Sequence, residues 1–372
     1  MKRYVVLVII YMLMVPFFVG CSSVESKSEK GADLTEENLS LNEQFSFSEK
    51  NAIKKKHRID SMGNGANANE DIESNVINGA ENINDENEGI ANENITPEGS
   101  DILGAKGVKI NIQNSKFAIS DELLAEINNV INGYEGKSSF YVVSMEDNMS
   151  FGYNPDVAFE TASTIKAPFA LYCFKEIAKG NASLDEEKIY EERFYRDGSG
   201  VLQYEPIGGV YTLKELLFYT INCSDNIAYY MIHDRFWDEG YNNMLRNLGC
   251  EQYYLPNGSK WGWASARSAA LIWQEIYKFS KESTEGAIYF DMLLNAQYSY
   301  IKPGVPQYKS AHKSGWTELL CHDTGIVFAE KPYIIAVMTD NEGAWSGSEQ
   351  IRRLTACSDK VMKEYGLWLK NK

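Results

Sequence analysis

A serine and a lysine three residues apart, Ser163 and Lys166, form the part of this sequence best suited to chemistry. A serine hydroxyl is a poor nucleophile until a base takes its proton, and a lysine in an apolar, crowded place has a lowered pKa and can be that base. On a helix, residues i and i+3 share a face, so the two side chains can meet. A helix start also offers free N–H groups and a positive dipole end to a developing oxyanion.

The spacing Ser-x-x-Lys occurs three times, at Ser163/Lys166, Ser299/Lys302 and Ser310/Lys313. Taken alone, each match is also explained by a surface serine near a solvated lysine. Only the first opens an apolar helical pattern, formed by Ala170, Cys173, Phe174 and Ile177. Pro168 is tolerated only near a helix start, whereas Pro303 after Lys302 ends a helix. The context therefore favours Ser163, on a helix that begins there and runs to about Gly180.

A second motif, Ser224-Asp225-Asn226, follows the nucleophile by 61 residues, at an expected helix–helix junction. A hydroxyl there can pass a proton to a leaving nitrogen, and an amide can hold a substrate carbonyl. Taken alone, the motif is better explained by N-capping of the second helix.

A third motif, Lys313-Ser314-Gly315, lies on an expected strand near the C-terminus. A lysine and a hydroxyl at a strand edge suit a substrate carboxylate. The glycine lets a substrate backbone approach closely. An ordinary strand end is the alternative explanation of this motif.

Together and in this order, the three motifs are the signature of class A β-lactamases and penicillin-binding proteins, which this chain resembles. The likeness covers about residues 108–370. Several further segments look like the class A branch, namely GSGVLQ at 198–203, YTLKELL at 211–217, AHKSG at 311–315 and HDTGIV at 322–327. The resemblance implies an α/β (α+β) fold of the β-lactamase/transpeptidase type. In that fold an antiparallel sheet is flanked by N- and C-terminal helices and joined to an all-helical lobe, with the site between them.

The resemblance also implies roles for individual residues. Ser163 would be the acylated nucleophile and Lys166 its base or proton partner. Ser224 would shuttle a proton to the leaving nitrogen, and Asn226 would position the substrate amide.

The third motif would complete this predicted site. Lys313 and Ser314 would receive the substrate carboxylate, beside Gly315. The N–H groups of Ser163 and Trp316 would form the oxyanion hole, although the Trp316 side chain is bulkier than the residue usual at that position.

One departure from the family concerns deacylation. Class A β-lactamases carry a Glu between the second and third motifs that activates the deacylating water, and residues 249–265 contain no Glu-Pro-x-Leu-Asn pattern. Glu251 is the only carboxylate there, and it lies close to the preceding helix. The usual arginine partner of the substrate carboxylate is not identifiable after Gly315. We therefore expect complete acylation chemistry and slow hydrolysis of the acyl-enzyme.

Residues 1–20 are predicted to be a lipoprotein signal peptide. Lys2 and Arg3 precede an apolar run that is short for a membrane span and ends in Phe18-Val19-Gly20-Cys21. The resemblance to bacterial lipoprotein signals implies lipidation of Cys21, with Phe18 in place of the usual Leu. An uncleaved anchor is the alternative, and both place the rest outside the cytoplasm, on the cell membrane.

Residues 21–105 are predicted to be a lipidated N-terminus followed by a disordered acidic tether. No aromatic residue occurs from Gly63 to Gly104, and residues 60–105 hold 11 acidic and no basic side chains. Such a composition buries too little apolar surface to offset its chain entropy. Much of the chain's net charge of −16 therefore lies here, and we expect no nucleic-acid partner.

Residues 106–372 are predicted to form the hydrolase domain, with the helical lobe at about 163–299. The expected helices are 120–132, 163–180, 212–219, 226–236, 239–248, 265–279, 285–296 and 348–367; the expected strands are 139–145, 149–153, 308–316, 323–329 and 333–339. The five cysteines after Cys21 match no metal spacing, and the four histidines show no ligand pairing. We expect no metal or other cofactor, and a monomer.

Three functions fit these patterns. The first is a class A-like β-lactamase that forms an acyl-enzyme at Ser163. The second is a cell-wall D,D-peptidase acting on D-Ala-D-Ala ends of peptidoglycan stem peptides. The third is a surface lipoprotein that binds β-lactam or peptidoglycan with little turnover.

Overall fold

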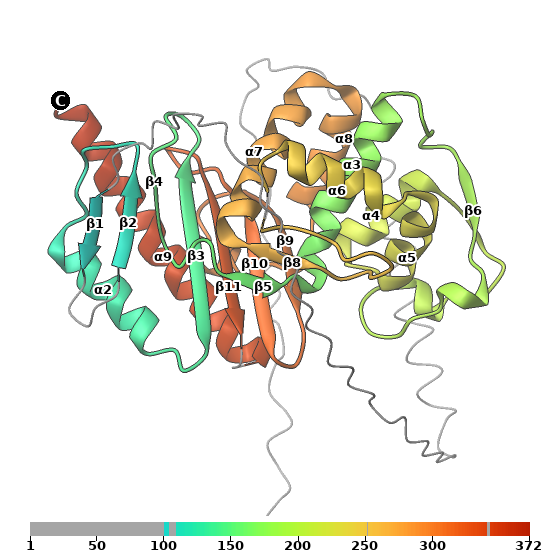
Figure 1. Ribbon diagram of the computed structural model, residues 1–372, viewed down its shortest axis with the longest axis horizontal. Coiled ribbons are helices and arrows are strands. Elements are labelled where there is room, and N and C mark those ends of the chain that lie inside the picture. The colour runs from blue at the N-terminus through green and yellow to red at the C-terminus, as the bar shows by residue number, and fades with distance from the viewer. Residues whose placement is uncertain (1–99, 104–108, 251, 341–342) are drawn as a thin grey trace, which may run out of the picture. The chain divides into compact units, whose positions relative to one another are not determined.

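A seven-stranded antiparallel sheet is the central layer of the computed structural model, which describes residues 100–103, 109–250, 252–340 and 343–372 (Figure 1). Its strands run in the order β1-β2-β4-β3-β11-β10-β9. Their bounds are β1 Ser100–Leu103, β2 Lys109–Gln113, β3 Lys137–Ser144, β4 Ser150–Tyr153, β9 Ser310–Trp316, β10 Leu320–Val327 and β11 Tyr333–Asp340. The neighbouring strands β3 and β4, β9 and β10, and β10 and β11 follow one another in the chain, whereas helix α2 (Asp121–Asn132) lies between β2 and β3 and the helical segments lie between β4 and β9.

Helices cover both faces of this sheet. Helix α9 (Gly343–Lys370) packs on β10 and β11 and against α2 (Asp121–Asn132), whereas α7 (Ala266–Glu282) packs on β3, β10 and β11. The central strands are consequently buried on both sides, so β10 and β11 are apolar or buried almost throughout rather than alternating.

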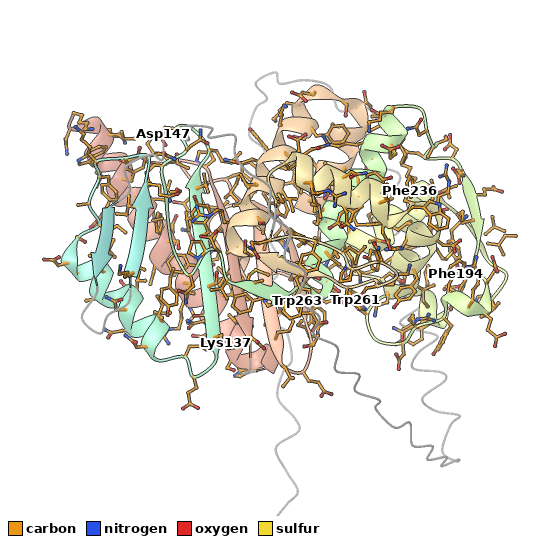
Figure 2. The ribbon with its side chains drawn as sticks, in the orientation of Figure 1. Lys137, Asp147, Phe194, Phe236, Trp261 and Trp263 are labelled. Carbon is orange, nitrogen blue, oxygen red and sulfur yellow. The ribbon has the colours of Figure 1, made fainter. Side chains whose placement is uncertain are left out.

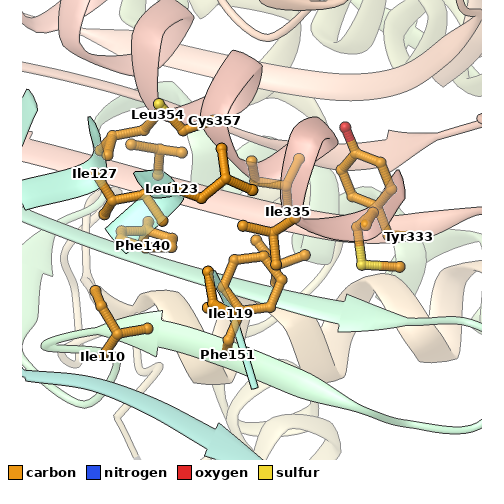
Figure 3. Packing of buried hydrophobic residues seen from close by; sticks show 14 of the residues in the cluster. Ile110, Ile119, Leu123, Ile127, Phe140, Phe151, Tyr333, Ile335, Leu354 and Cys357 are labelled. Atoms are coloured by element: carbon orange, nitrogen blue, oxygen red, sulfur yellow. The ribbon is translucent and has the colours of Figure 1, made fainter. Parts of the chain in front are cut away.

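The core between the sheet and the pair α2–α9 is a single apolar cluster (Figure 3). Ser120 caps α2 by accepting a hydrogen bond from the N–H of Leu123, and its hydroxyl donates to Glu364 of α9 at 2.7 Å. The helix then buries the apolar face that its spacing predicts, consisting of Leu123, Leu124, Ile127, Val130 and Ile131. These contacts fix the terminal helices to the sheet.

The second lobe is mainly helical. It contains α3 (Lys166–Ala178), α4 (Leu213–Asn222), α5 (Asn226–Arg235), α6 (Asp238–Asn247) and α8 (Thr284–Leu294), with the 3₁₀ turns η1 Ala162–Ile165, η2 Glu192–Phe194, η3 Leu202–Tyr204 and η4 Lys302–Gly304 in its connections. Two small sheets pair β5 (Ala158–Glu160) with β8 (Trp263–Ser265) and β6 (Glu187–Ile189) with β7 (Val210–Thr212). The fold class predicted from the sequence is confirmed.

Three details differ from the expectations. Strand β1 at Ser100–Leu103 pairs with β2, so the sheet begins before the predicted boundary at residue 106. Helix α7 lies inside the predicted helical lobe but packs on the sheet. Helix α9 begins at Gly343 rather than near Ser348. The predicted signal peptide, Cys21 and nearly all of the predicted tether lie outside the described residues.

No helix within the described ranges is long and apolar enough to cross a membrane. The five cysteines after Cys21 are all free and buried, namely Cys173, Cys223, Cys250, Cys321 and Cys357.

Deleting β1 tests the revised boundary. A chain that starts at residue 106 should fold, but its free energy of unfolding should be about 1–3 kcal/mol below that of a chain starting at residue 99, because cross-strand pairs contribute roughly 0.2–1 kcal/mol each. Urea unfolding of the two chains measures the difference. Acylation at Ser163 should be equal in both, since β9 is at the opposite edge of the sheet. Equal stabilities would show that β1 contributes nothing.

Candidate active site

The turn that carries Ser163 joins β5 to α3. The sequence predicts a helix beginning at Ser163, whereas the structure places Ser163 in the 3₁₀ turn η1 and starts the α-helix at Lys166. Ala162 has a φ of +41°, a left-handed conformation that is rare for a residue with a side chain. The half-buried Ser163 therefore lies on a sharp, strained turn, and Lys166 begins the rigid helix behind it.

The strained turn is held from two sides. Thr161 exchanges hydrogen bonds with Gly262, its N–H donating to the Gly262 carbonyl at 2.9 Å and its hydroxyl accepting from the Gly262 N–H at 3.2 Å. The ring of His322 on β10 lies with Nε2 2.7 Å from the Glu160 carbonyl, and burial lowers the pKa of His322 to about 4. His322 is thus neutral and fastens the end of β5 to the central sheet.

The Lys166 side chain is completely buried, and its amine sits at the centre of the site. Nζ lies 2.8 Å from Asn226 Oδ1, 3.3 Å from Ser224 Oγ and 2.5 Å from the Ser224 carbonyl. Burial, and then the nearby charge of Lys313, hold the pKa of Lys166 well below its usual value, against the opposing attraction of Asp225. A lowered pKa favours the neutral amine, the form of lysine that can accept a proton from a hydroxyl.

The junction of α4 and α5 presents Ser224 to two lysines. Ser224 has a φ of +57° and is fully buried, and its hydroxyl lies 3.1 Å from Nζ of Lys313 as well as 3.3 Å from Nζ of Lys166. A hydroxyl between two amines can accept a proton from one side and give one up on the other. This is the geometry that the predicted shuttle requires.

Asp225 maintains this junction, and it makes the N-cap that the sequence analysis gave as the alternative explanation of the second motif. One carboxylate oxygen caps α5 by accepting from the N–H of Ala228 at 2.9 Å, and the other accepts from Val201 and Leu202 at 2.6 and 2.8 Å. Burial raises the pKa of Asp225, while these backbone hydrogen bonds and Lys166 oppose that rise. The cap was predicted as an alternative, whereas the hydrogen bonds to Val201 and Leu202 come from a distant segment and were not.

The same loop positions Asn226. The Asn226 amide nitrogen donates to the Asp197 carbonyl at 3.1 Å, while its oxygen accepts from Lys166. Its backbone N–H donates to Ser199. Gly200 has a φ of +108°, and a side chain there would meet the Asp225 carboxylate at 2.2 Å. The loop at 197–202 can therefore close over Asn226 only with glycine at that point.

Strand β9 brings the third motif to the nucleophile. Lys313 is buried, its Nζ also donates to the Ser314 carbonyl at 2.9 Å, and burial lowers its pKa to about 8. A Cβ atom at Gly315 would lie 2.5 Å from the backbone nitrogen of Ser163, so only glycine lets the strand approach the turn this closely. The sequence analysis explained Gly315 by the close approach of a substrate backbone. The structure gives a second reason, because the backbone of Ser163 itself lies against Gly315.

Ser314 is oriented differently from the sequence expectation. Its side chain is fully buried, and its hydroxyl donates to the Tyr298 carbonyl at 2.6 Å instead of standing free for a carboxylate. The Ser314 hydroxyl thus satisfies the buried carbonyl of Tyr298. The motif alone could not predict this contact, because Tyr298 belongs to another segment of the chain. Trp316 at the strand end is 36% exposed and packs edge-on against Tyr298, with ring centroids 5.6 Å apart.

Two aromatic rings lie beside Lys166, one from α5 and one from the loop between the second and third motifs. The rings of Tyr229 and Trp261 have their centroids 5.7 and 5.8 Å from Nζ. Glu251 lies outside the described residues, and 249–265 hold no other carboxylate. Sequence reasoning did not single out Trp261, because nothing in the sequence distinguishes it from the nearby Trp263.

The structure thus brings together the backbone at Ser163 and the side chains of Lys166, Ser224, Asn226 and Lys313. In the described part of the chain, no group of three His, Cys, Asp or Glu side chains is arranged to hold a metal ion. The arrangement offers a hydroxyl on a strained turn, a buried neutral amine one residue into the following helix, and a second hydroxyl between two amines. These are the components of acyl transfer through a serine.

Comparison with known proteins places this arrangement in a family. The family model described as "Beta-lactamase enzyme family" matches residues 122–365, which include all three motifs. The chain belongs to the beta-lactamase enzyme family. Within it, the β-lactamase VEB-1 of Pseudomonas aeruginosa is 29% identical over 113 residues, a match spanning 30% of this chain and 38% of VEB-1.

Solved structures of β-lactamases and of PBP-A share the fold. A β-lactamase from Sphaerobacter thermophilus superposes with a TM-score of 0.59 at 22% identity, covering 64% of this chain and 96% of its own. PBP-A superposes with a TM-score of 0.61 at 23% identity, covering 65% and 96%. A leucine-to-glutamate mutant of PBP-A, solved as an acyl-enzyme complex with penicillin G, superposes at 0.60.

Gly315→Ala tests the contact between β9 and the nucleophile turn. The added Cβ would lie 2.5 Å from the nitrogen of Ser163 and 2.7 Å from that of Thr164, which forces strand and turn apart. Because losing one oxyanion donor costs about 10²–10³-fold, acylation by penicillin should slow by about 10²-fold or more. Gly366→Ala on α9, where the nearest contact is an ordinary 3.4 Å, is the control and should keep the wild-type rate. Equal rates in both variants would contradict the assigned geometry.

Proposed function

We propose that this family member is an extracytoplasmic serine hydrolase that β-lactams acylate at Ser163 and that releases the acyl group slowly. The observation that carries the proposal is the buried amine of Lys166, at the start of the helix that follows Ser163 and bonded to Ser224 and Asn226. A charged lysine is expensive to bury, and no carboxylate forms an ion pair with Lys166 among the described residues, so burial favours the neutral, basic form against the attraction of Asp225.

Acylation follows from this geometry. Neutral Lys166 takes the proton of Ser163 while the serine oxygen attacks the β-lactam carbonyl carbon. The carbonyl oxygen gains the negative charge and is held by the N–H groups of Ser163 and Trp316. When it re-forms the carbonyl, the C–N bond of the ring breaks, and the nitrogen takes the proton of Ser224. Ser224 regains a proton from the Lys166 or Lys313 ammonium beside it.

Deacylation needs a base within hydrogen-bond reach of a water molecule. The side of Lys166 that faces the loop is occupied by the rings of Tyr229 and Trp261, and neither ring can accept the proton of that water. Asn226 and Ser224 on the other side are not bases at neutral pH. Lys166 itself, the base of acylation, has these two rings on the side from which a deacylating water would reach its amine. The acyl-enzyme should therefore persist.

A cell-wall D,D-peptidase is the second candidate. Residues 249–265 contain no carboxylate besides Glu251, and this favours the peptidase because an acyl-enzyme that avoids hydrolysis by water can be passed to an amine. The fold is shared with PBP-A, whose mutant forms an acyl-enzyme with penicillin G. The third candidate is a surface protein that binds β-lactam or peptidoglycan with little turnover. Its acyl group would be released so slowly that binding is the main activity.

The location is proposed from the sequence. The apolar run that ends at Cys21 resembles a lipoprotein signal, which would lipidate that cysteine and hold the protein on the outer side of the cell membrane. Both proposed substrate classes, β-lactams and stem peptides, occur there.

Penicillin labelling tests the nucleophile. Intact-mass measurement should show one penicillin added with its full mass, because opening the ring loses no atoms, and peptide mapping should place it at Ser163. Ser163→Ala should abolish the adduct. Ser299→Ala and Ser310→Ala carry the other two Ser-x-x-Lys matches and should label normally. An adduct on Ser163→Ala would overturn the assignment.

Pre-steady-state kinetics on nitrocefin test deacylation. A fast burst should precede steady turnover, since positioned general bases typically contribute ~10²–10⁴-fold and none is evident for the second step. Glu251→Gln should change neither phase. Rapid turnover without a burst, or loss of turnover in Glu251→Gln, would show that the loop does carry a base. Faster turnover of a D-Ala-D-Ala peptide than of nitrocefin would favour the peptidase.

A further inference from the structure

Three polar side chains of the helical lobe form a network beside the active site. His233 of α5 has Nδ1 2.7 Å from Nζ of Lys260 and Nε2 2.9 Å from Oδ1 of Asp238 at the start of α6. The His233 side chain is only 2% exposed, and its ring stacks on Phe169 of α3 with centroids 4.7 Å apart and planes within 3°. The imidazole is therefore fixed between a lysine and a carboxylate.

The protonation of His233 follows from its partners. Burial, and then the charge of Lys260, lower the pKa of His233 to about 4, against the attraction of Asp238, so the ring is neutral at neutral pH. A lysine ammonium can only donate, which makes Nδ1 the acceptor and leaves the ring proton on Nε2. Nε2 lies 2.9 Å from Oδ1 of Asp238 without the geometry of a hydrogen bond, so the neutral imidazole accepts from Lys260 and is in close contact with the carboxylate.

This network fixes one point of the loop that faces the active site. The Lys260 carbonyl accepts a hydrogen bond from the Tyr229 hydroxyl at 2.8 Å, and Asp238 accepts one from the N–H of Gly258 at 3.2 Å. The next residue is Trp261, whose ring packs against that of Tyr229 with centroids 5.6 Å apart. In Figure 2, Trp261 lies on the helical-lobe side of Trp263.

We propose that Trp261 is the cover that keeps Lys166 dry, and that Lys260, His233 and Asp238 are positioning residues that hold it there. This inference rests on the proposed function, in which Lys166 is the base. The Trp261 ring is half-buried and its centroid lies 5.8 Å from Nζ, so water that would otherwise solvate the amine is excluded from that side. The same exclusion denies deacylation its water.

The pKa of Lys166 gives a readout that reports on this cover. Its largest lowering influence is burial, and the other groups that act on it are Lys313 on β9, which lowers it, and Asp225 and Cys223 at the α4–α5 junction, which raise it. None of these three lies on the loop. A change that admits water past Trp261 therefore raises the pKa of Lys166 without altering its charged neighbours.

The first experiment is the pH profile of acylation by penicillin, followed by intact mass. The rate constant should rise with pH as Lys166 loses its proton. In Trp261→Ala this rise should move to higher pH by one unit or more, and in His233→Phe, which can keep the stack on Phe169, by a smaller amount in the same direction. Trp263→Ala, two residues on at the start of β8 and with a 42% exposed side chain, is the control and should leave the profile in place.

The second experiment replaces the cover by a base. Trp261→Glu places a carboxylate beside Lys166 and should speed release of the penicilloyl group at least tenfold. Trp261→Gln has a side chain of the same size as glutamate but no basic group, and its release rate should rise by less than tenfold. In Trp261→Glu with His233→Phe the gain should shrink, because the loop is no longer held. Trp261→Leu keeps an apolar side chain over Lys166 and should keep the wild-type pH profile of acylation. It is the control if the polar variants fail to fold.

The outcomes separate this inference from the proposed function. If no adduct forms at Ser163 in the wild-type protein, the proposed function fails and the inference with it. If the adduct forms but Trp261→Ala leaves the pH profile unmoved, the inference alone is overturned. If Trp261→Ala shifts the profile but His233→Phe keeps the wild-type profile, the positioning role of His233 is refuted and the covering role of Trp261 stands.

Discussion

The burial of one lysine amine is the constraint on which the rest of this site depends. Lys166 is fully buried, and its Nζ is surrounded by Ser224, Asn226 and the rings of Tyr229 and Trp261. Burial of a charged group without a close carboxylate is costly, so the pKa falls and the amine becomes a base. The elements around Lys166 must therefore exclude water from Nζ and still allow the proton of the Ser163 hydroxyl to reach it.

Two of the five described non-glycine residues with a left-handed backbone belong to the active site, and the other three are asparagines. Ala162, beside the nucleophile, and Ser224, in the second motif, both have left-handed φ values of +41° and +57°. Such conformations each cost on the order of 1–3 kcal/mol and persist only where the surroundings enforce them. Here the enforcement comes from the hydrogen bonds of Thr161 with Gly262 and from the buried carboxylate of Asp225, which accepts from three backbone N–H groups. Rigid surroundings thus hold two reactive hydroxyls in place before substrate arrives.

Each lobe carries a different part of the active site. The helical lobe supplies the amine and the shuttle hydroxyl, whereas the sheet supplies Lys313 and the close approach of Gly315 to the backbone of Ser163. An edge strand can perform this second task because one of its sides is not paired within the sheet. His322 and Asp323 on the adjacent strand support both sides of the arrangement, binding the Glu160 carbonyl and the N–H groups of 300 and 301. The site is accordingly as rigid as the core beneath it.

The sequence by itself determined the motifs, their order, most helices and the hairpins, because periodicity, capping and turn residues act between neighbours along the chain. It could not place the α-helix start at Lys166, the hydroxyl of Ser314 on Tyr298, or Trp261 over the amine. Each of these depends on segments far apart in sequence, and a buried polar group takes whichever partner the folded chain brings nearest. The residues that do the chemistry are readable from their types and spacing, whereas the pKa of Lys166 exists only once distant segments have excluded water from it.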